Sequence, residues 1–147
     1  LRFDGRIGED FKLLSAVWVQ SARLRLTAMP ALAGLVQDIV ITGENRADIG
    51  MLVFPDPQRG LQAGDDGTIC DAEYCAKIRS VLAKLAATAT GSSHRIVRAI
   101  ILGEAPSVKA HEITAKGNLN TNAVLRHRAE FVERLYDDSD PATILIG

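Results

Sequence analysis

The stretch VQDIVITGENRADIGMLVFPD (residues 36–56) decides the fold, because it reads as two strands joined by a short polar turn. Residues 36–43 alternate in character and close on Gly43, and residues 49–56 form an apolar run that stops at Pro55 and Pro57. The polar residues 44–48 between the two runs are typical of a turn. The sequence therefore predicts an antiparallel pair of strands.

Further elements are predicted on both sides of this pair. The clearest is a helix over residues 71–91, with Asp71 as its N-cap and Gly91 just past its end, because its apolar residues share one face. The other expected elements are a hairpin arm at 11–20, a short helix within 21–34 that meets Pro30, a strand at 95–104 and a helix at 121–138. The last helix should bury Val124, Leu125, Phe131, Val132, Leu135 and Tyr136.

This order of elements predicts a small α+β domain. It would consist of an N-terminal β-hairpin and a few-stranded sheet packed by about three helices, with the helices on one side of the sheet. A chain of 147 residues is most simply one domain. Residues 139–147 are expected to be a loosely held tail, with local packing of residues 143–146 (TILI) as the alternative.

Composition argues against several classes of protein. The chain has 17 basic and 18 acidic residues and no polybasic run, so neither nucleic acid nor a membrane surface is an expected partner. Its apolar runs are far shorter than the roughly 20 residues that span a bilayer, and its first residues lack the apolar region of a signal peptide. Cys70 and Cys75 have no histidine at ligand spacing, which predicts reduced thiols and no metal site. These features fit a cytoplasmic protein.

The loop HEITAKGNLN (residues 111–120) places Lys116 beside Gly117. A loop lysine carries a compact positive charge, and glycine lets the backbone approach a ligand closely. Lys116 would therefore suit negative charge that develops on a phosphate or carboxylate. The alternative is that Lys116 is one of five solvated lysines and that the following residues are a turn into a capped helix. On spacing alone this alternative is favoured.

Arg6 and Trp18 each have a functional and a structural interpretation. The planar guanidinium of Arg6 suits a phosphate or sugar hydroxyl, but taken alone a surface pair with Glu9 or Asp10 is favoured. Trp18 is expected to anchor the hairpin in the core, with a place in a ligand-binding wall as the less favoured alternative.

The three histidines are scattered along the sequence. The pattern places no serine, cysteine or acidic partner beside His94, His111 or His127, so no nucleophile–base pair is predicted. His127 lies between Arg126 and Arg128 in the final helix and is expected to be exposed.

Two segments taken together resemble the adenylate-forming acyl-CoA synthetases. DGRIGEDFKL (residues 4–13) resembles the hinge-and-hairpin motif of that family, and with the Trp-Val pair that follows it is most similar to the feruloyl-CoA synthase branch. EITAKGNLNTNAVLRHRAEFVERLY (residues 112–136) resembles the C-terminal end of that branch. Residues 36–56 are similar to the family's paired strands, so the resemblance covers nearly the whole chain.

The resemblance implies that the chain is the small C-terminal lid domain of an ATP-dependent acid–CoA ligase. Its parts would be a hinge and hairpin (1–20), an α+β body (21–138) and a tail (139–147), and the large N-terminal adenylation domain is absent. In this family a carboxylate attacks the α-phosphorus of ATP with Mg²⁺ assisting, and the thiol of coenzyme A then displaces AMP. The lid rotates between the two steps. ATP or AMP, Mg²⁺, coenzyme A and an aromatic, ferulate-like carboxylic acid would be bound mainly by the absent domain, so the isolated fragment is expected to be inactive.

The same resemblance assigns roles to particular residues. Lys116 matches the adenylation lysine, Arg6 the arginine that contacts the nucleotide, and Gly8 the hinge, where a glycine absorbs a large change of φ and ψ. The hairpin over residues 11–19 would line the coenzyme A channel. The hairpin residues assigned to that channel are Lys12, Ser15, Ala16 and Trp18.

Two departures from the family pattern keep other interpretations open. The family carries a glycine near Ala16, where the backbone passes pantetheine, and elsewhere in the superfamily the lysine motif reads glycine-lysine, whereas here it reads lysine-glycine. A free-standing binding or interaction module is therefore one alternative function. A degenerate lid that is retained for stability is another.

Overall fold

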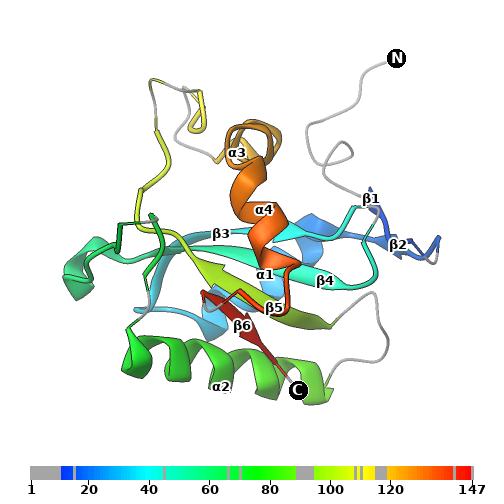
Figure 1. Cartoon of the computed structure of the whole chain (residues 1–147). Helices are drawn as coiled ribbons and strands as arrows, with labels where there is room; N and C mark the ends of the chain where they lie inside the picture. Colours follow the sequence, from blue (N-terminus) through cyan, green and yellow to red (C-terminus); the bar gives the residue numbers. More distant parts are fainter. Residues whose placement is uncertain are drawn as a thin grey trace.

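The computed structural model describes residues 11–14, 16–44, 46–65, 67–69, 71–88, 95–107, 109, 111–114, 119–140 and 142–146. In chain order its elements are β1 (Phe11–Lys12), β2 (Trp18–Val19), α1 (Ser21–Ala31), β3 (Val36–Thr42), β4 (Ile49–Pro55), the 3₁₀ helix η2 (Pro57–Arg59), α2 (Ala72–Thr88), β5 (Ile96–Ile101), α3 (Thr121–His127), α4 (Ala129–Leu135) and β6 (Thr143–Leu145) (Figure 1). The predicted small α+β domain with an N-terminal hairpin is confirmed.

A four-stranded mixed sheet in the order β3-β4-β5-β6 forms the centre of the fold. β3 and β4 pair antiparallel, with Ile41 opposite Met51, as residues 36–56 predicted. β4 and β5 run parallel, and a parallel neighbour requires a long crossover, which here contains α2. The predicted N-cap of α2 is present, because the Asp71 carboxylate accepts a hydrogen bond of 2.8 Å from the Tyr74 amide.

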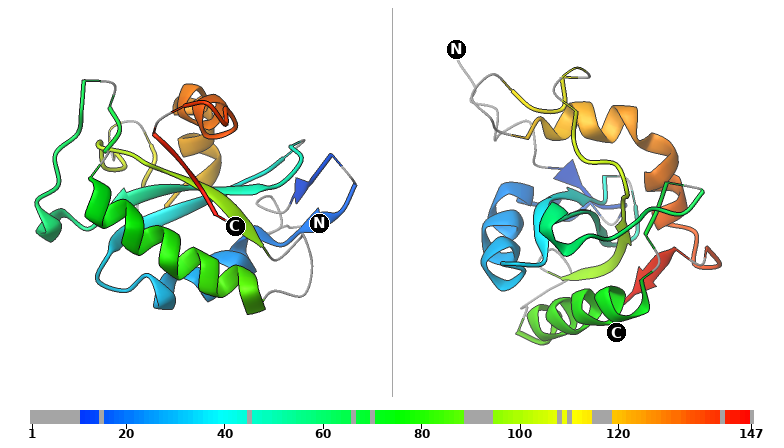
Figure 2. Two further views of the ribbon diagram at one scale, coloured as in Figure 1. Left: turned by 60° about the horizontal axis from the view of Figure 1, so that its bottom comes forward. Right: turned by 90° about the vertical axis from the view of Figure 1, so that its left-hand side faces the viewer.

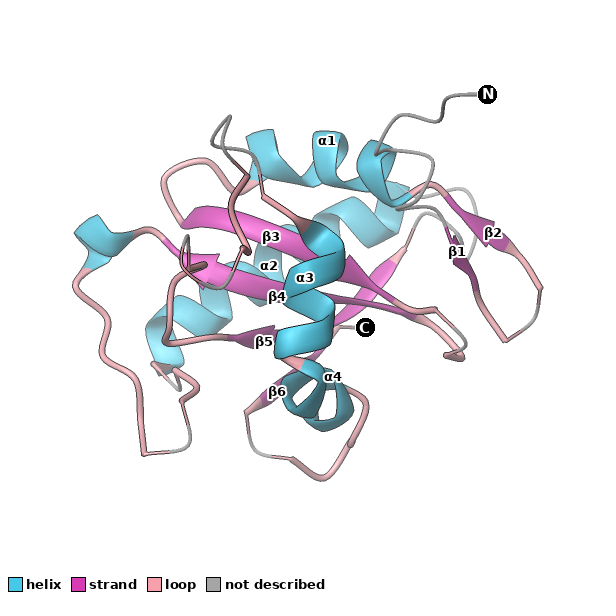
Figure 3. Ribbon diagram, turned by 90° about the horizontal axis from the view of Figure 1, so that it is seen from above, coloured by secondary structure: helices cyan, strands magenta, loops and turns pink. Residues whose placement is uncertain are grey.

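Helices cover both faces of the sheet, so the prediction that they lie on one side is wrong (Figures 2 and 3). Ile41, Met51 and Val53 belong to the core under α1 and α2, whereas Leu52 and Phe54 belong to the core under α3 and α4. The physical reason is visible in β4, where residues 49–54 are all buried. A strand with both faces covered reads as a continuous apolar run and does not alternate.

The predicted helix over 121–138 is two helices that meet at Arg128. This residue has φ −114° and ψ 30°, which ends α3 and begins α4. The six apolar residues expected on the buried face do pack into the core beneath α3 and α4. No helix in the described part of the chain is long and apolar enough to cross a membrane.

The last described residues complete the sheet, so the alternative that residues 143–146 pack locally is confirmed and the loosely held tail is wrong. β6 pairs antiparallel with β5, with Ile144 opposite Ala99, and the Ile146 amide donates to the Val97 carbonyl at 2.8 Å. The side chains of Ala142, Ile144 and Ile146 are buried. Their alternation with exposed or half-exposed neighbours is a strand pattern that was too short to be decisive in the sequence.

Candidate functional site

The hairpin β1–β2 is held to the body of the domain by its inner face. Phe11, Leu13 and Val19 are buried. Phe11 and Leu13 lie so close to Gly43 that an added Cβ there would come within 2.9 Å of the Phe11 ring and 3.3 Å of the Leu13 side chain. The Leu14 amide also donates to the Arg46 carbonyl at 2.9 Å, in the turn between β3 and β4. The hairpin is therefore anchored at the turn end of the β3–β4 pair.

The outer face of the hairpin is apolar and carries one cation. Trp18 is 60% exposed, and the Lys12 ammonium lies 5.1 Å from the centroid of its ring. The prediction that Trp18 is a core anchor is therefore wrong. Phe11 pairs with Val19 and Lys12 with Trp18, and because side chains alternate across a strand, burial of the first pair turns the second outward. Leu14 and Val17 are exposed beside them.

Ala16 lies in the turn of the hairpin with a φ of 67°, in the left-handed region. Its amide donates to the Leu13 carbonyl at 2.9 Å, and the Leu13 amide donates to Val17 at 3.0 Å. Glycine adopts this conformation without the clash that a Cβ introduces. The family resemblance predicts a glycine near this position. Ala16 has the left-handed backbone conformation that is typical of glycine. Ser15, the fourth residue assigned to this hairpin, lies outside the described residues.

The second expected site, the loop around Lys116, is described only at its base. Lys116 lies outside the described residues, as do Arg6 and Gly8. At the base Ile113 and Leu119 form an antiparallel bridge, and the Asn120 amide donates to the Glu112 carbonyl at 2.7 Å. The Asn120 side chain then caps α3 by accepting a hydrogen bond from the Ala123 amide at 3.2 Å. The loop over 113–119 is therefore closed at its base and continues directly into α3.

A buried ion pair, Glu112–Arg128, lies at the base of this loop. The guanidinium donates to both Glu112 oxygens, from Nε at 3.1 Å and from Nη2 at 2.9 Å. It also donates to the carbonyls of Glu104, at 2.7 Å, and Ala105, at 3.1 Å. Glu112 is 2% exposed and Arg128 is 6% exposed. Buried charges are tolerated when they are paired and hydrogen-bonded in this way.

The electrostatics of Glu112 favour its charged form. Burial by itself raises the pKa of the carboxyl, but hydrogen bonds from Arg128, the Ser107 amide and His127 outweigh it and leave the pKa below its ordinary value. His127 is exposed, as predicted, and its Nδ1 lies 3.4 Å from Glu112 Oε2. An open cavity of about 430 Å³ adjoins this pair, with His111 and Phe131 among its lining residues.

The sequence pattern did not indicate this pair, because its members are 16 residues apart. A usable signal was present. Arg128 follows Val124 by four residues and precedes Val132 by four, which places it on the buried face of a helical segment. A buried arginine requires an acidic or carbonyl partner, and Glu112 is the buried acid nearby.

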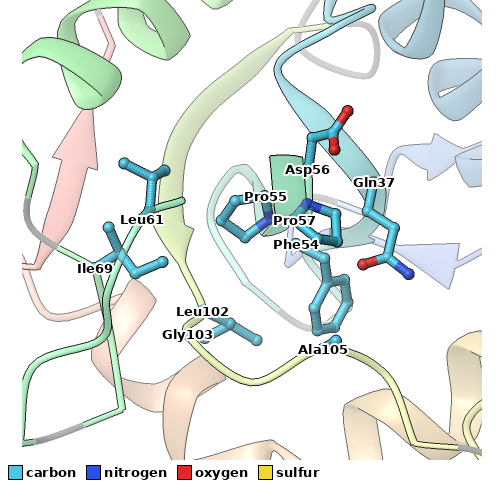
Figure 4. Close-up of a pocket in the computed structure, with 10 residues that line it drawn as sticks. All are labelled: Gln37, Phe54, Pro55, Asp56, Pro57, Leu61, Ile69, Leu102, Gly103 and Ala105. Atoms are coloured by element: carbon cyan, nitrogen blue, oxygen red, sulfur yellow. The ribbon is translucent and has the colours of Figure 1, made fainter. Parts of the chain in front are cut away.

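A smaller cavity of about 260 Å³ lies at the carboxyl ends of β4 and β5 (Figure 4). Its walls are mainly apolar, and Phe54 is shared with the neighbouring ion pair, because the Arg128 guanidinium lies 5.1 Å from the centroid of the Phe54 ring. The lining residues are Gln37, Phe54, Pro55, Asp56, Pro57, Leu61, Ile69, Leu102, Gly103 and Ala105.

A second buried arginine, Arg98, joins β5 to the β3–β4 turn and to the end of α4. It donates to Asp48 at 2.9 and 3.2 Å, to Asp138 at 2.8 Å and to the Leu135 carbonyl at 3.0 Å. Burial opposes its charge, but the hydrogen bonds that it donates to the carboxylates of Asp138 and Asp48 raise its pKa above the ordinary value. Tyr136 stacks on the guanidinium at 4.9 Å. This cluster has all its partners within the fold and is structural.

The hairpin and the segment that follows β5, as far as it is described, lie at opposite ends of the sheet (Figure 1). The hairpin contacts the turn that precedes β4, whereas the loop over 104–119 follows the carboxyl end of β5, which runs parallel to β4. The seven residues of β4 separate these ends by about 20 Å. Among the described residues no group of three or more histidine, cysteine or acidic side chains gathers as a metal site would require.

The comparisons with known proteins agree with this fold. The A domain of carboxylic acid reductase from Segniliparus rugosus, in complex with AMP and a co-purified carboxylic acid, superposes with a TM-score of 0.61 and 17% identity, over 89% of this chain and 20% of that chain. The A-PCP didomain of carboxylic acid reductase from the same organism, in complex with AMP, superposes with a TM-score of 0.60 and 17% sequence identity. The match covers 87% of this chain and 17% of that chain. This chain therefore spans about a fifth of the length of these structures.

At this level of identity the two structures establish the fold alone. No protein with a curated description matches the chain. The family model of the AMP-binding enzyme C-terminal domain matches residues 26–140, which is most of the chain. The resemblance to adenylate-forming enzymes is thereby confirmed, and the chain belongs to the family of AMP-binding enzyme C-terminal domains.

Proposed function

We propose that this chain is the lid domain of an ATP-dependent acid–CoA ligase, which activates a carboxylic acid as an acyl-adenylate and transfers the acyl group to coenzyme A. The observation that carries the proposal is the placement of the exposed hairpin and the base of the loop over 113–119 at opposite ends of one sheet. A rotation of such a domain brings first one end and then the other to a single reaction pocket in an N-terminal adenylation domain. The family match is consistent with this role.

In the first step the loop end of the domain faces the pocket. A carboxylate oxygen of the substrate attacks the α-phosphorus of ATP, the new oxygen–phosphorus bond forms, and pyrophosphate leaves. The Lys116 ammonium bridges the carboxylate and the α-phosphate, which orients the attack and offsets the developing charge. Arg6 contacts the nucleotide, and Gly8 is the pivot that absorbs the rotation.

In the second step the hairpin end faces the pocket. The thiolate of coenzyme A attacks the acyl carbonyl carbon, and AMP leaves with the electron pair of the broken carbon–oxygen bond. The exposed Lys12 offers a cation to the phosphates of coenzyme A, and the exposed Trp18 face offers apolar contact to the pantetheine arm. Ser15 and the left-handed turn at Ala16 line the same channel. Mg²⁺, if it assists the first step, is held by the adenylation domain.

The acid that is activated is proposed to be aromatic and ferulate-like. The support for this is the resemblance of residues 4–13 and 112–136 to the feruloyl-CoA synthase branch. Pyrophosphate release by the full-length protein across a panel of ferulate, benzoate and fatty acids tests it. Turnover of fatty acids in preference to both aromatic acids overturns the substrate assignment and leaves the reaction type intact.

The substitution Lys116→Ala in the full-length protein tests the reaction itself. We expect pyrophosphate release to fall by about 10²-fold or more, as for the loss of one charge-stabilising group, with thioester formation from preformed acyl-adenylate spared. An equal fall in both half-reactions makes Lys116 structural. No pyrophosphate release from the wild type with any acid favours the alternatives of a degenerate lid or an interaction module.

The substitution Gly8→Pro tests the hinge. It should restrict the rotation of the domain and so uncouple the two half-reactions, and unchanged rates of both half-reactions would contradict the assignment of Gly8 as the hinge.

A further inference from the structure

We propose that Arg46 is a positioning residue for the thiol step, because it sets where the hairpin β1–β2 holds Lys12 and Trp18 relative to the body of the domain. The inference deepens the proposed function and rests on it. In this scheme Arg46 touches neither coenzyme A nor the acyl-adenylate. Its effect passes to the hairpin through its own backbone carbonyl.

Arg46 contacts the hairpin through its backbone. Its carbonyl accepts the Leu14 amide at 2.9 Å, and its amide donates to the Gly43 carbonyl at 2.9 Å. The Leu14 side chain is 69% exposed, so this residue is attached by its backbone and not by packing. Leu14 follows Lys12 by two residues, so the place of its amide and the place of the Lys12 side chain depend on one short stretch of chain.

The side chain of Arg46 fixes the same residue to α4. Its guanidinium forms an ion pair with Glu133 and lies over the Tyr136 ring, 4.8 Å from the centroid. Glu133 belongs to α4, and Tyr136 is the C-cap of that helix. A cation that contacts both a carboxylate and an aromatic face is held at two points. Arg46 therefore joins the hairpin, through its carbonyl, to the end of α4, through its side chain.

Tyr136 is a fixed surface for this contact. Its hydroxyl donates to the Asp48 carbonyl at 2.9 Å and lies 3.1 Å from Thr42 Oγ1 in β3. Its ring also lies 4.9 Å from the guanidinium of the buried Arg98 in β5. The position of Arg46 is thus referred to the central sheet. Because a misplacement of about 1 Å can cost about 10²-fold in rate, even a partial loss of this reference should be measurable at the hairpin.

The exposure of the Arg46–Glu133 pair argues against a role in stability alone. The two side chains are 29% and 70% exposed, and ion pairs as exposed as this contribute little to the free energy of unfolding. An Arg46 variant should therefore fold, and its effect on the hairpin can be measured in an intact protein.

The first test measures the hairpin directly, by hydrogen exchange in the full-length protein. In Arg46→Gln the Leu14 amide should exchange about tenfold faster, because its acceptor carbonyl is no longer held from α4. Glu133→Gln should act in the same direction, and it carries the test if Arg46→Gln fails to fold. Arg46→Lys keeps a cation for Glu133 and for the Tyr136 ring, so it should restore most of the protection. Unchanged exchange in Arg46→Gln and Glu133→Gln overturns the inference.

The second test separates the two half-reactions in the same variants. In Arg46→Gln the KM for coenzyme A in thioester formation from preformed acyl-adenylate should rise by about tenfold, with kcat little changed. Pyrophosphate release should be unaffected, because the hairpin does not face the pocket in the first step. Arg46→Lys should again come close to the wild type. Parallel losses in both half-reactions would show a general structural defect and overturn the inference.

The matched control is Arg134→Gln. Arg134 also belongs to α4 and also combines an ion pair, with Asp140 at 2.8 and 3.1 Å, with an aromatic ring, that of Phe131 at 6.0 Å. It joins α4 to the segment before β6 and not to the turn that holds the hairpin. Both the exchange of the hairpin and the KM for coenzyme A should therefore stay normal in Arg134→Gln. Equal changes in Arg134→Gln and Arg46→Gln would overturn the inference.

The variant Trp18→Ala distinguishes failure of this inference from failure of the proposed function. If Trp18→Ala impairs thioester formation while Arg46→Gln changes neither exchange nor thioester formation, the inference fails and the proposed function stands. If exchange of the hairpin accelerates in Arg46→Gln but thioester formation is normal in both variants, the hairpin has no part in the thiol step. The proposed role of the hairpin then fails, and the inference fails with it.

Discussion

The ammonium group of Lys12 lies 5.1 Å from the centroid of the exposed Trp18 ring, on the face of the hairpin that points away from the core. A cation over an exposed aromatic face contributes about 0.5–1 kcal/mol, which is too little to explain a large exposed indole by stability alone. Exposed aromatic residues are enriched at sites of contact. The pair is therefore best examined through variants that separate folding from the thiol step.

Trp18→Ala should leave folding nearly intact and slow the second half-reaction. The lost contact with Lys12 lowers the free energy of unfolding by less than about 1 kcal/mol. Thioester formation from preformed acyl-adenylate should fall by about tenfold or more, as for the loss of an aromatic anchor, while pyrophosphate release is unchanged. Leu26→Ala is the control, because Leu26 is 75% exposed and belongs to α1, outside the hairpin strands. A Trp18→Ala protein with a normal thiol step would remove this face from the mechanism.

Ala16→Gly should stabilise the protein. The φ of 67° costs an alanine about 1–2 kcal/mol, which exceeds the extra flexibility that glycine adds to the unfolded chain, so the net gain is about 1 kcal/mol. Urea unfolding of the full-length protein measures it. The same change at Ala83, an exposed position inside α2, should act in the opposite direction by about 1 kcal/mol. Destabilisation at both positions contradicts the left-handed turn.

Glu112→Gln should make stability less sensitive to acid. The folded pKa of Glu112 lies below the ordinary value of 4.5, since Arg128, the Ser107 amide and His127 all face its carboxylate. The charged carboxylate of Glu112 therefore contributes its full stabilisation above pH 4.5. This contribution is lost as the pH falls through the lower pKa that Glu112 has in the folded protein. The difference in unfolding free energy between wild type and Glu112→Gln should shrink over that acid range. A difference that is constant with pH would show that the carboxylate is not held in its charged form.

Tyr136→Phe should lower stability by about 1 kcal/mol, because the hydroxyl donates to the Asp48 carbonyl at 2.9 Å and lies 3.1 Å from Thr42 Oγ1. Burial raises the pKa of Tyr136 to about 12. The associated stability is present below the ordinary value of 10.0 and is lost as the pH rises through about 12. The tyrosinate absorbance that disappears in Tyr136→Phe should titrate near pH 12, and titration near pH 10 would contradict the buried position.

The central strands were predictable because their signal is local. The two apolar runs in residues 36–56 and the polar turn between them specify β3 and β4, and Asp71 marks the start of α2 by side-chain chemistry alone. The hairpin arm over residues 11–20 was also predicted from its own residues, and the family resemblance added only a role for it. Trp18 was wrongly predicted to be buried, because the burial usual for a large aromatic side chain was given more weight than strand alternation. Val19 is buried, so alternation turns its neighbour Trp18 outward.

Other features depend on contacts that are distant in sequence. The interruption at Arg128 follows from a guanidinium that reaches Glu112 and two carbonyls, and no propensity within residues 121–138 reports those partners. β6 has three residues and becomes a strand because β5 offers an open edge. Whether helices cover one face of a sheet or two is likewise decided by packing, although the unbroken apolar run of β4 was a sign of it.

The short strand β6 has a practical consequence for anyone who shortens this protein. Without residues 142–146, β5 would present unpaired backbone groups along its outer side, next to apolar surface that Ile144 and Ile146 now cover. An open edge of this kind recruits strands from other molecules. A truncated protein would then be lost to aggregates in the cell extract, and its absence from an assay would be mistaken for a defect in function.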